Sequence, residues 1–115
     1  MMILNDSPLG IAQGNTDLFE EFTDGGDMWT GDGTRTRRTH VTFDQPFTAP
    51  PAVHCSLSLF DIDQSTNMRG DISVDNITES GFVIVFSTWG NTRIARARAN
   101  WLAIGQAKDP DRWDV

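Results

Sequence analysis

Residues 81–104 read GFVIVFSTWGNTRIARARANWLAI, and this stretch decides the fold class. The first part, residues 81–88, is rich in β-branched and aromatic residues and therefore predicts a strand. In the second part, residues 93–104, two kinds of side chain alternate along the chain. One face carries alanines and Trp101, and the other carries Ile94, Arg96, Arg98, Asn100, Leu102 and Ile104. Successive side chains of a strand point to opposite faces, so a slip of one residue would bury the arginines, and the register is well specified.

Strand patterns continue on the N-terminal side of this stretch. Residues 69–77 and 38–43 predict strands, and the first strand is either residues 11–13 or residues 18–22. Residues 53–59 also alternate, and their inward set is Val53, Cys55, Leu57 and Leu59.

Turn residues separate these segments. Pro50 and Pro51 end one strand, residues 63–67 form a polar loop, and residues 89–92 form a tight turn. Residues 76–81 predict a hairpin connection with a positive φ at Gly81. About six short strands with regular turns predict an all-β protein, a six-stranded antiparallel β-sandwich.

The length of 115 residues fits one domain. We expect an N-terminal segment at residues 1–9, a sandwich domain at 10–105 and a polar tail at 106–115. In that tail, Trp113 is able to pack back on the domain. A single cysteine excludes an internal disulfide framework.

The net charge of -7 argues against broad binding to nucleic acid, because phosphates repel surplus carboxylates. No run approaches the ~20 apolar residues of a membrane helix, so we expect no membrane insertion. The N-terminus lacks a basic head and a sustained apolar stretch, and therefore does not resemble a secretory signal. The expected location is the cytoplasm or, by a non-classical route, outside the cell.

The residues that often carry catalysis have simpler interpretations here. Cys55 lies in the middle of a strand and is expected to be a small core residue. His40 and His54 are expected on strand surfaces, and Asp61 and Asp63 at a turn. We find no nucleophile motif and no phosphate loop, so we expect no enzyme activity, no cofactor and no metal site.

Binding is the better prediction, because three loops each carry one group suited to a sugar. Asp32 offers a carboxylate to adjacent hydroxyls, Arg69 a guanidinium fork, and Trp89 an aromatic face for the C–H side of the ring. Each also has a structural alternative. Asp32 fits a turn, Arg69 an ion pair with a nearby aspartate, and Trp89 a cap on the core.

The sequence resembles the H-type lectin domain of snail agglutinins and of the C-terminal part of discoidins. The resemblance covers residues 10–105 and is carried by six motifs in order: RxxHVTF (37–43), PFxxPPxV (46–53), FDIDQSxNMR (60–69), NITxxGF (76–82), TWxNT (88–92) and NWLAI (100–104). It implies the same six-stranded sandwich, association into homotrimers, a role in cell adhesion, and recognition of terminal galactose or N-acetylgalactosamine.

The resemblance also implies a site. Asp32 and Arg69 would hold vicinal hydroxyls, Trp89 would pack on the ring, and Gly31 is the nearest candidate for a backbone contact. Gly90 stands where the snail lectins have a histidine, which removes a polar contact near the acetamido group. The carbohydrate-binding set is therefore Asp32, Arg69, Trp89, Gly31, Gly90 and Asn91.

Two functional hypotheses follow. The first is a non-catalytic lectin that binds galactose-type sugars through shallow sites on a trimer. The alternative is a structural or interaction module, such as a phage-tail or secreted-complex component, that keeps the fold without binding sugar. The outer face of residues 94–104 is either a trimer interface or a solvated edge. In the trimer, Arg96 and Arg98 would pair with acidic residues 17–27 of a neighbour.

Overall fold

The computed structural model describes residues 1–4 and 8–109. The predicted tail residue Trp113 lies outside these ranges. Within them the chain forms the six predicted strands and one single-turn helix: β1 (Leu9–Glu20), α1 (Asp27–Thr30), β2 (Arg35–Thr42), β3 (Ala52–Ile62), β4 (Asp71–Asp75), β5 (Gly81–Thr88) and β6 (Ile94–Gln106). Both alternatives for the first strand fall largely within β1. No helix in the described ranges has the length and apolar character needed to cross a membrane.

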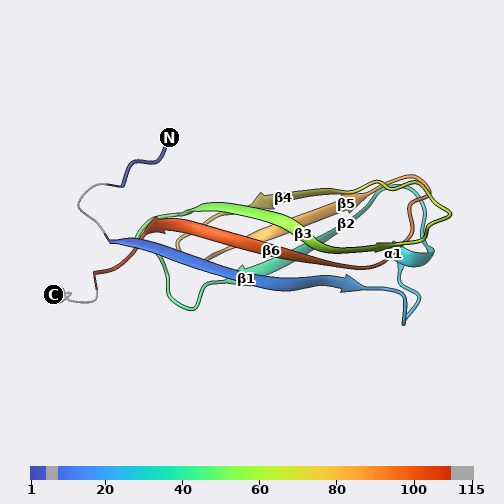
Figure 1. Ribbon diagram of the computed structural model, residues 1–115, viewed down its shortest axis with the longest axis horizontal. Helices are drawn as coiled ribbons and strands as arrows, with labels where there is room; N and C mark the ends of the chain where they lie inside the picture. Colours follow the sequence, from blue (N-terminus) through green and yellow to red (C-terminus); the bar gives the residue numbers. More distant parts are fainter. Residues whose placement is uncertain (5–7, 110–115) are drawn as a thin grey trace.

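The strands form two antiparallel three-stranded sheets, in the orders β1-β6-β3 and β2-β5-β4. The prediction of an all-β antiparallel sandwich is confirmed. Figure 1 shows the two layers running along the long axis, with α1 and several loops gathered at one end. The turn at residues 89–92 leads from β5 in one sheet to β6 in the other.

The core fills the space between the central strands of the two sheets. From β5, Ile84 and Phe86 are fully buried, and from β6, Ala97 and Ala99 face them with 1% and 0% exposure. Small alanines leave room for the large β5 side chains, as close packing requires. Cys55 packs against this core from β3 as a half-buried residue, and burial raises the pKa of its thiol.

Two side chains lie on a different face from the one predicted. Leu59 was expected to point inward, but a β-bulge between Leu57 and Leu59 reverses the alternation, and Phe60 packs on the core instead. Ile94 was expected on the outer face with the arginines. It is fully buried, because β6 begins where α1 contacts it, and Ile94 joins the core cluster with Met28 of α1.

The β4–β5 hairpin also differs in detail from the prediction. The positive φ falls on Asn76, at 51°, and not on Gly81. Gly81 is needed for a different reason: a Cβ at this position would lie 2.1 Å from the carbonyl oxygen of Val41 in the neighbouring strand. The glycine therefore permits close approach of two strands and does not make the turn.

The outer face of β6 is not an edge, because β6 lies between β1 and β3. The arginines on it have partners within the chain. Arg96 Nε lies 3.0 Å from Asp61 Oδ2 on β3, and Arg98 Nε lies 3.3 Å from Asp17 Oδ1 on β1. An acidic neighbour is therefore not required to neutralise these arginines.

Candidate functional site

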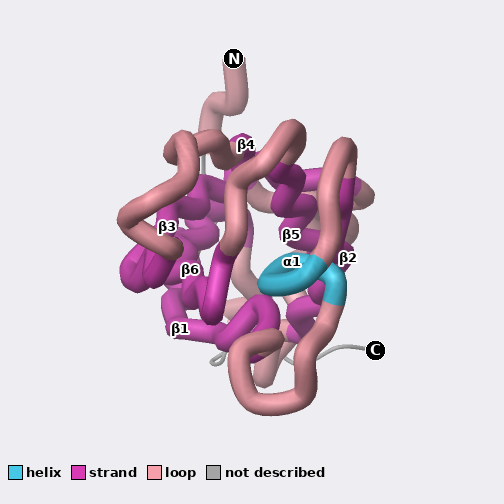
Figure 2. The backbone as a smooth tube through the Cα atoms, turned by 90° about the vertical axis from the view of Figure 1, so that its right-hand side faces the viewer, coloured by secondary structure: helices cyan, strands magenta, loops and turns pink. Residues whose placement is uncertain are grey.

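The predicted site residues lie in three connections at the end of the sandwich that carries α1. Asp32 lies between α1 and β2, Arg69 between β3 and β4, and Trp89 between β5 and β6. Figure 2 looks at this end of the molecule and shows α1 surrounded by the loops. The topology thus brings together segments that lie 57 positions apart in the sequence, from 32 to 89.

The loop of Asp32 is bonded directly to the loop of Trp89. The Gly33 N–H donates to the Gly90 carbonyl at 3.0 Å and also contacts the exposed carboxylate of Asp32 at 2.9 Å. Both glycines have positive φ, 74° at Gly33 and 66° at Gly90. This backbone conformation costs glycine little, and it lets the backbones of the two loops approach within hydrogen-bonding distance.

Arg69 lies across the glycine that follows Trp89. A Cβ built on Gly90 would stand 3.0 Å from Arg69 Nη1, so the missing side chain makes room for the guanidinium. Arg69 Nη1 donates to Asn91 Oδ1 at 2.9 Å, and the same oxygen accepts from the Asn67 side chain at 3.2 Å. Within the described ranges Arg69 makes no ion pair, so the salt-bridge alternative is wrong.

Two buried threonines fix the loops beneath this network. Thr88 and Thr92 are fully buried. The Thr88 hydroxyl donates to the Arg69 carbonyl at 2.6 Å, and the Thr92 hydroxyl donates to the Asn67 carbonyl at 2.7 Å. Because buried polar groups are costly when unpaired, these bonds hold the β3–β4 loop to the β5–β6 turn.

The remaining members of the predicted set differ in what they can offer. Trp89 is 44% exposed, which leaves much of the indole accessible and is inconsistent with a buried core cap. The Gly31 N–H donates to the Asp27 carbonyl at 2.7 Å, at the end of α1. That N–H is therefore not available to a ligand. Asn91 is exposed, and its side-chain oxygen accepts a hydrogen bond from Arg69 and so orients the guanidinium.

The residues considered for catalysis do not converge. His40 and His54 are exposed on strands, as expected. Asp61 pairs with Arg96 on the outer face of the sheet, whereas Asp63 sits in a loop with Arg93 3.5 Å away. Backbone and side-chain hydrogen bonds from Ser65 hold the pKa of Asp63 below its ordinary value. The described ranges contain no group of three or more His, Cys, Asp or Glu placed to hold a metal ion.

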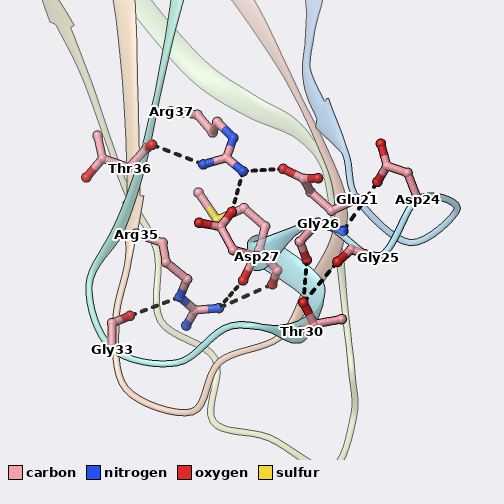
Figure 3. Close-up of polar contacts among 11 residues, drawn as sticks. Glu21, Asp24, Gly25, Gly26, Asp27, Thr30, Gly33, Arg35, Thr36 and Arg37 are labelled. Atoms are coloured by element: carbon pink, nitrogen blue, oxygen red, sulfur yellow. Dashed lines mark hydrogen bonds and ion pairs between the residues drawn. The ribbon is translucent and has the colours of Figure 1, made fainter.

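Sequence reasoning missed the ionic cluster beside α1. Figure 3 shows Arg37 pointing at the carboxylates of Glu21 and Asp27 and bonding to both. Glu21 is buried, and its carboxylate occupies the space where a Gly26 side chain would stand. The hydrogen bond from Arg37 lowers the pKa of Asp27. The acidic residues 17–27 were identified in the sequence, but the pairing of two of them with Arg37 of the same chain was not.

Sequence reasoning also missed Arg35, which lies close to Arg37 and Arg38 in the sequence. The three side chains have different environments: Arg35 is 6% exposed, Arg37 is half-buried, and Arg38 is exposed and pairs with Asp75 at 3.0 Å. One feature of the sequence pointed to Arg35: it is the first residue of a strand and follows a glycine-rich loop.

Comparison with known proteins gives relatives of two kinds. The chain is 53% identical over 114 residues to the protein of ATP synthase subunits region ORF 7 from Fuscovulum blasticum, with 99% of each chain covered. It is 33% identical over 78 residues to discoidin-2 from Dictyostelium discoideum, covering 65% of this chain and 30% of discoidin-2. The chain thus spans nearly all of the first relative and less than a third of the second.

The fold is also found among solved structures. Discoidin II from Dictyostelium discoideum superposes with a TM-score of 0.75 and 24% identity, covering 90% of this chain and 40% of that chain. The family model of the H-type lectin domain matches residues 38–104, which is more than half of the chain. The described strands β3, β4 and β5, most of β2 and most of β6 lie within that match. This protein therefore belongs to the H-type lectin domain family.

Proposed function

We propose that this protein is a non-catalytic lectin that binds terminal galactose-type sugars at the end of the sandwich that carries α1. The observation that carries the proposal is the meeting of the Asp32 and Trp89 loops through the 3.0 Å bond from Gly33 to Gly90, with Arg69 lying on the same Gly90. One carboxylate, one guanidinium and one exposed indole are thus gathered at one end of the fold.

Each group suits one part of a pyranose. The carboxylate of Asp32 accepts hydrogen bonds from hydroxyls, and Arg69 donates to adjacent oxygens in a planar fork. Trp89 offers an apolar face to the C–H side of the ring, as amphipathic aromatic side chains do. The set holds a single carboxylate, whereas glycoside hydrolysis uses two, so the proposal includes no catalysis.

Gly90 bears on which galactose-type sugar is preferred. Arg69 occupies the space beside Gly90, where a larger side chain would displace it. The polar groups of the proposed site therefore bind hydroxyls, and position 90 provides no side chain for an acetamido group. We infer that galactose and N-acetylgalactosamine bind with similar affinity, which a glycan array carrying both sugars measures directly.

The outer face of the β1-β6-β3 sheet supports the proposal of a homotrimer. Leu9, Ile11 and Leu102 are 57%, 63% and 37% exposed on this side, and the ion pairs of Arg96 and Arg98 lie further along it. Burial of such apolar residues between copies is favourable. A single monosaccharide site makes few contacts, and three sites on one assembly raise avidity for clustered glycans. A solution mass of one chain would refute the trimer.

The site is tested with Asp32→Ala and Arg69→Ala. We expect each to weaken glycan binding by about tenfold or more, because a hydrogen bond to a charged group contributes about 1.5–3 kcal/mol. Binding is measured on a galactose-bearing array and by calorimetry with galactose. The matched controls are Asp44→Ala and Arg38→Ala, an exposed aspartate and an exposed arginine away from these loops.

The outcomes separate the two functional hypotheses. Loss of binding in both site variants and not in the controls supports the lectin assignment. Unchanged binding in both site variants would refute the site. A wild-type protein that is trimeric and binds no sugar on the array would refute the lectin assignment and favour the structural or interaction module.

A further inference from the structure

The buried arginine at the start of β2 is the strongest unexplained feature of the structure. Arg35 is 6% exposed, yet no carboxylate lies within ion-pair distance of it in the described ranges. Burial of a cation is costly unless its donors are paired. The partners of Arg35 must therefore compensate for the loss of water, and their identity shows what the residue does.

Two edges of the guanidinium face the β1–β2 connection. Arg35 Nε donates to the Gly33 carbonyl at 2.9 Å. Nη1 donates to the carbonyls of Asp27 and Met28 in α1, at 3.1 and 3.3 Å. Figure 3 shows the side chain reaching between α1 and the turn at Gly33. Arg35 thus joins α1 to the turn that carries Asp32.

The third edge faces the β5–β6 turn. Arg35 Nη2 donates to the carbonyls of Gly90 and Thr92, at 3.2 and 2.8 Å. A guanidinium has five N–H donors in a rigid fork, and in the described part of the chain all five have a backbone carbonyl as acceptor. Lysine carries three donors on a single nitrogen and cannot reach three segments at once.

The acceptors are neighbours of the proposed sugar-binding residues. Gly33 follows Asp32, and Gly90 follows Trp89 and underlies Arg69. Because every bond goes to the main chain, Arg35 fixes loop backbones and not individual side chains. We propose that Arg35 is the positioning residue that sets Asp32 relative to Trp89 and Arg69, an inference that rests on the sugar site proposed above.

The test compares Arg35→Lys with Val41→Ala. Arg35→Lys keeps the charge and removes the fork. Val41 lies on the same strand, is 9% exposed and belongs to the hydrophobic core. Val41→Ala therefore lowers stability without touching the loops. Denaturant titration gives the free energy of unfolding of both variants, so that local effects are compared at known global stability.

The first readout is amide hydrogen exchange at Gly33, whose N–H bonds to the Gly90 carbonyl across the two loops. We expect exchange at Gly33 to be about tenfold or more faster in Arg35→Lys than in Val41→Ala, after correction for global stability, since loss of a charge-assisted bond frees the loop. The amide of Ile84 in β5 should report global stability alone. Equal exchange at Gly33 in the two variants would overturn the proposal.

The second readout is the affinity for galactose. We expect Arg35→Lys to weaken it by about tenfold or more and Val41→Ala to leave it unchanged. Faster exchange at Gly33 with wild-type affinity would refute the positioning role. A wild-type protein that binds no galactose refutes the sugar site instead, and the link from Arg35 to sugar with it, while the exchange data still decide whether Arg35 joins the loops.

A measurement on the wild-type protein covers the case in which Arg35→Lys does not fold. Five paired donors should protect the guanidinium protons of Arg35 from solvent. We expect the Nε proton of Arg35 to exchange about tenfold or more slowly than that of the exposed Arg38 by NMR. Equal exchange of the two arginines would show that the fork is open in solution and would overturn the proposal.

Discussion

Where β1 begins, aromatic rings close the end of the sandwich, whereas at the α1 end a buried guanidinium joins the loops. The aromatic end consists of tilted or edge-on rings with centroids 5.1–5.8 Å apart, from Phe43, Phe47, Phe82 and Trp101. The loop end contains Arg35 with its carbonyl acceptors and the buried hydroxyls of Thr88 and Thr92.

The difference shows how one small domain separates stability from precision. Apolar packing has no fixed direction, so the aromatic end contributes free energy of unfolding and tolerates small shifts. Hydrogen bonds depend on distance and angle, so the loop end fixes positions at a smaller net gain in stability. Substitutions at the two ends should therefore separate global unfolding from loop geometry.

The largest effect is expected at the aromatic end. Phe82 is 3% exposed and contacts Phe43 and Trp101. Phe82→Ala should lower the free energy of unfolding by about 3–5 kcal/mol, through lost burial and the cavity left behind. Urea titration measures the loss, and galactose affinity of the folded fraction should stay at the wild-type value. A loss below about 1 kcal/mol would contradict the role given to this ring.

A smaller effect is expected from the hydroxyl beneath the loops. Thr92→Val is nearly isosteric and removes the 2.7 Å bond to the Asn67 carbonyl. The free energy of unfolding, measured by urea titration, should fall by about 1–3 kcal/mol, because that carbonyl loses its donor. Galactose affinity should fall as well, since Asn67 and Arg69 share the same loop.

The matched control is Thr36→Val, whose exposed hydroxyl bonds to Ser87 on the sheet surface. It should change stability by less than about 0.5 kcal/mol. If the two valine variants lose the same free energy, burial of the Thr92 hydroxyl has no special role in the loop end.

The smallest expected effect is a pH dependence of the free energy of unfolding, caused by Asp27 in α1. Because Arg37 lowers the folded-state pKa of Asp27 below 3.8, the charged carboxylate stabilises the fold at neutral pH, and this contribution is lost as pH falls through the folded-state pKa. The Asp27 carboxylate is exposed, so the contribution of the pair is at most about 1 kcal/mol. Asp27→Asn should be less stable than wild type at pH 7, and the gap should narrow as pH falls below 3.8. A gap that stays constant would contradict this account.

Several parts of the fold were predictable because they depend on local pattern. The alternation in residues 93–104 correctly placed Ala97, Ala99 and Trp101 on the core side. The failures arise from contacts between segments that are distant in the sequence. The bulge before Leu59 and the burial of Ile94 under α1 depend on contacts with other segments, and neither changes the pattern of the residues around it.

The members of the candidate site were predicted from the sequence, and how the loops are joined was not. Asp32, Arg69 and Trp89 were chosen from their chemistry and from the resemblance to H-type lectins, and the structure gathers their loops at one end. The role of Arg35 was not predictable, because a backbone carbonyl has no signature in the sequence. Likewise, the partners of Arg96 and Arg98 proved to lie on adjacent strands of the same chain.

The sequence by itself determined the all-β class, the two faces of its best-patterned strand and the family of the domain. These follow from hydrophobic periodicity and from ordered motifs, both of which are local properties of the chain. The tertiary structure alone decided which arginine is buried, which loops meet and which side chain a bulge turns outward. Those outcomes depend on which strands become neighbours and how their ends converge, and residues such as 35 and 90 are joined only after the two sheets have packed.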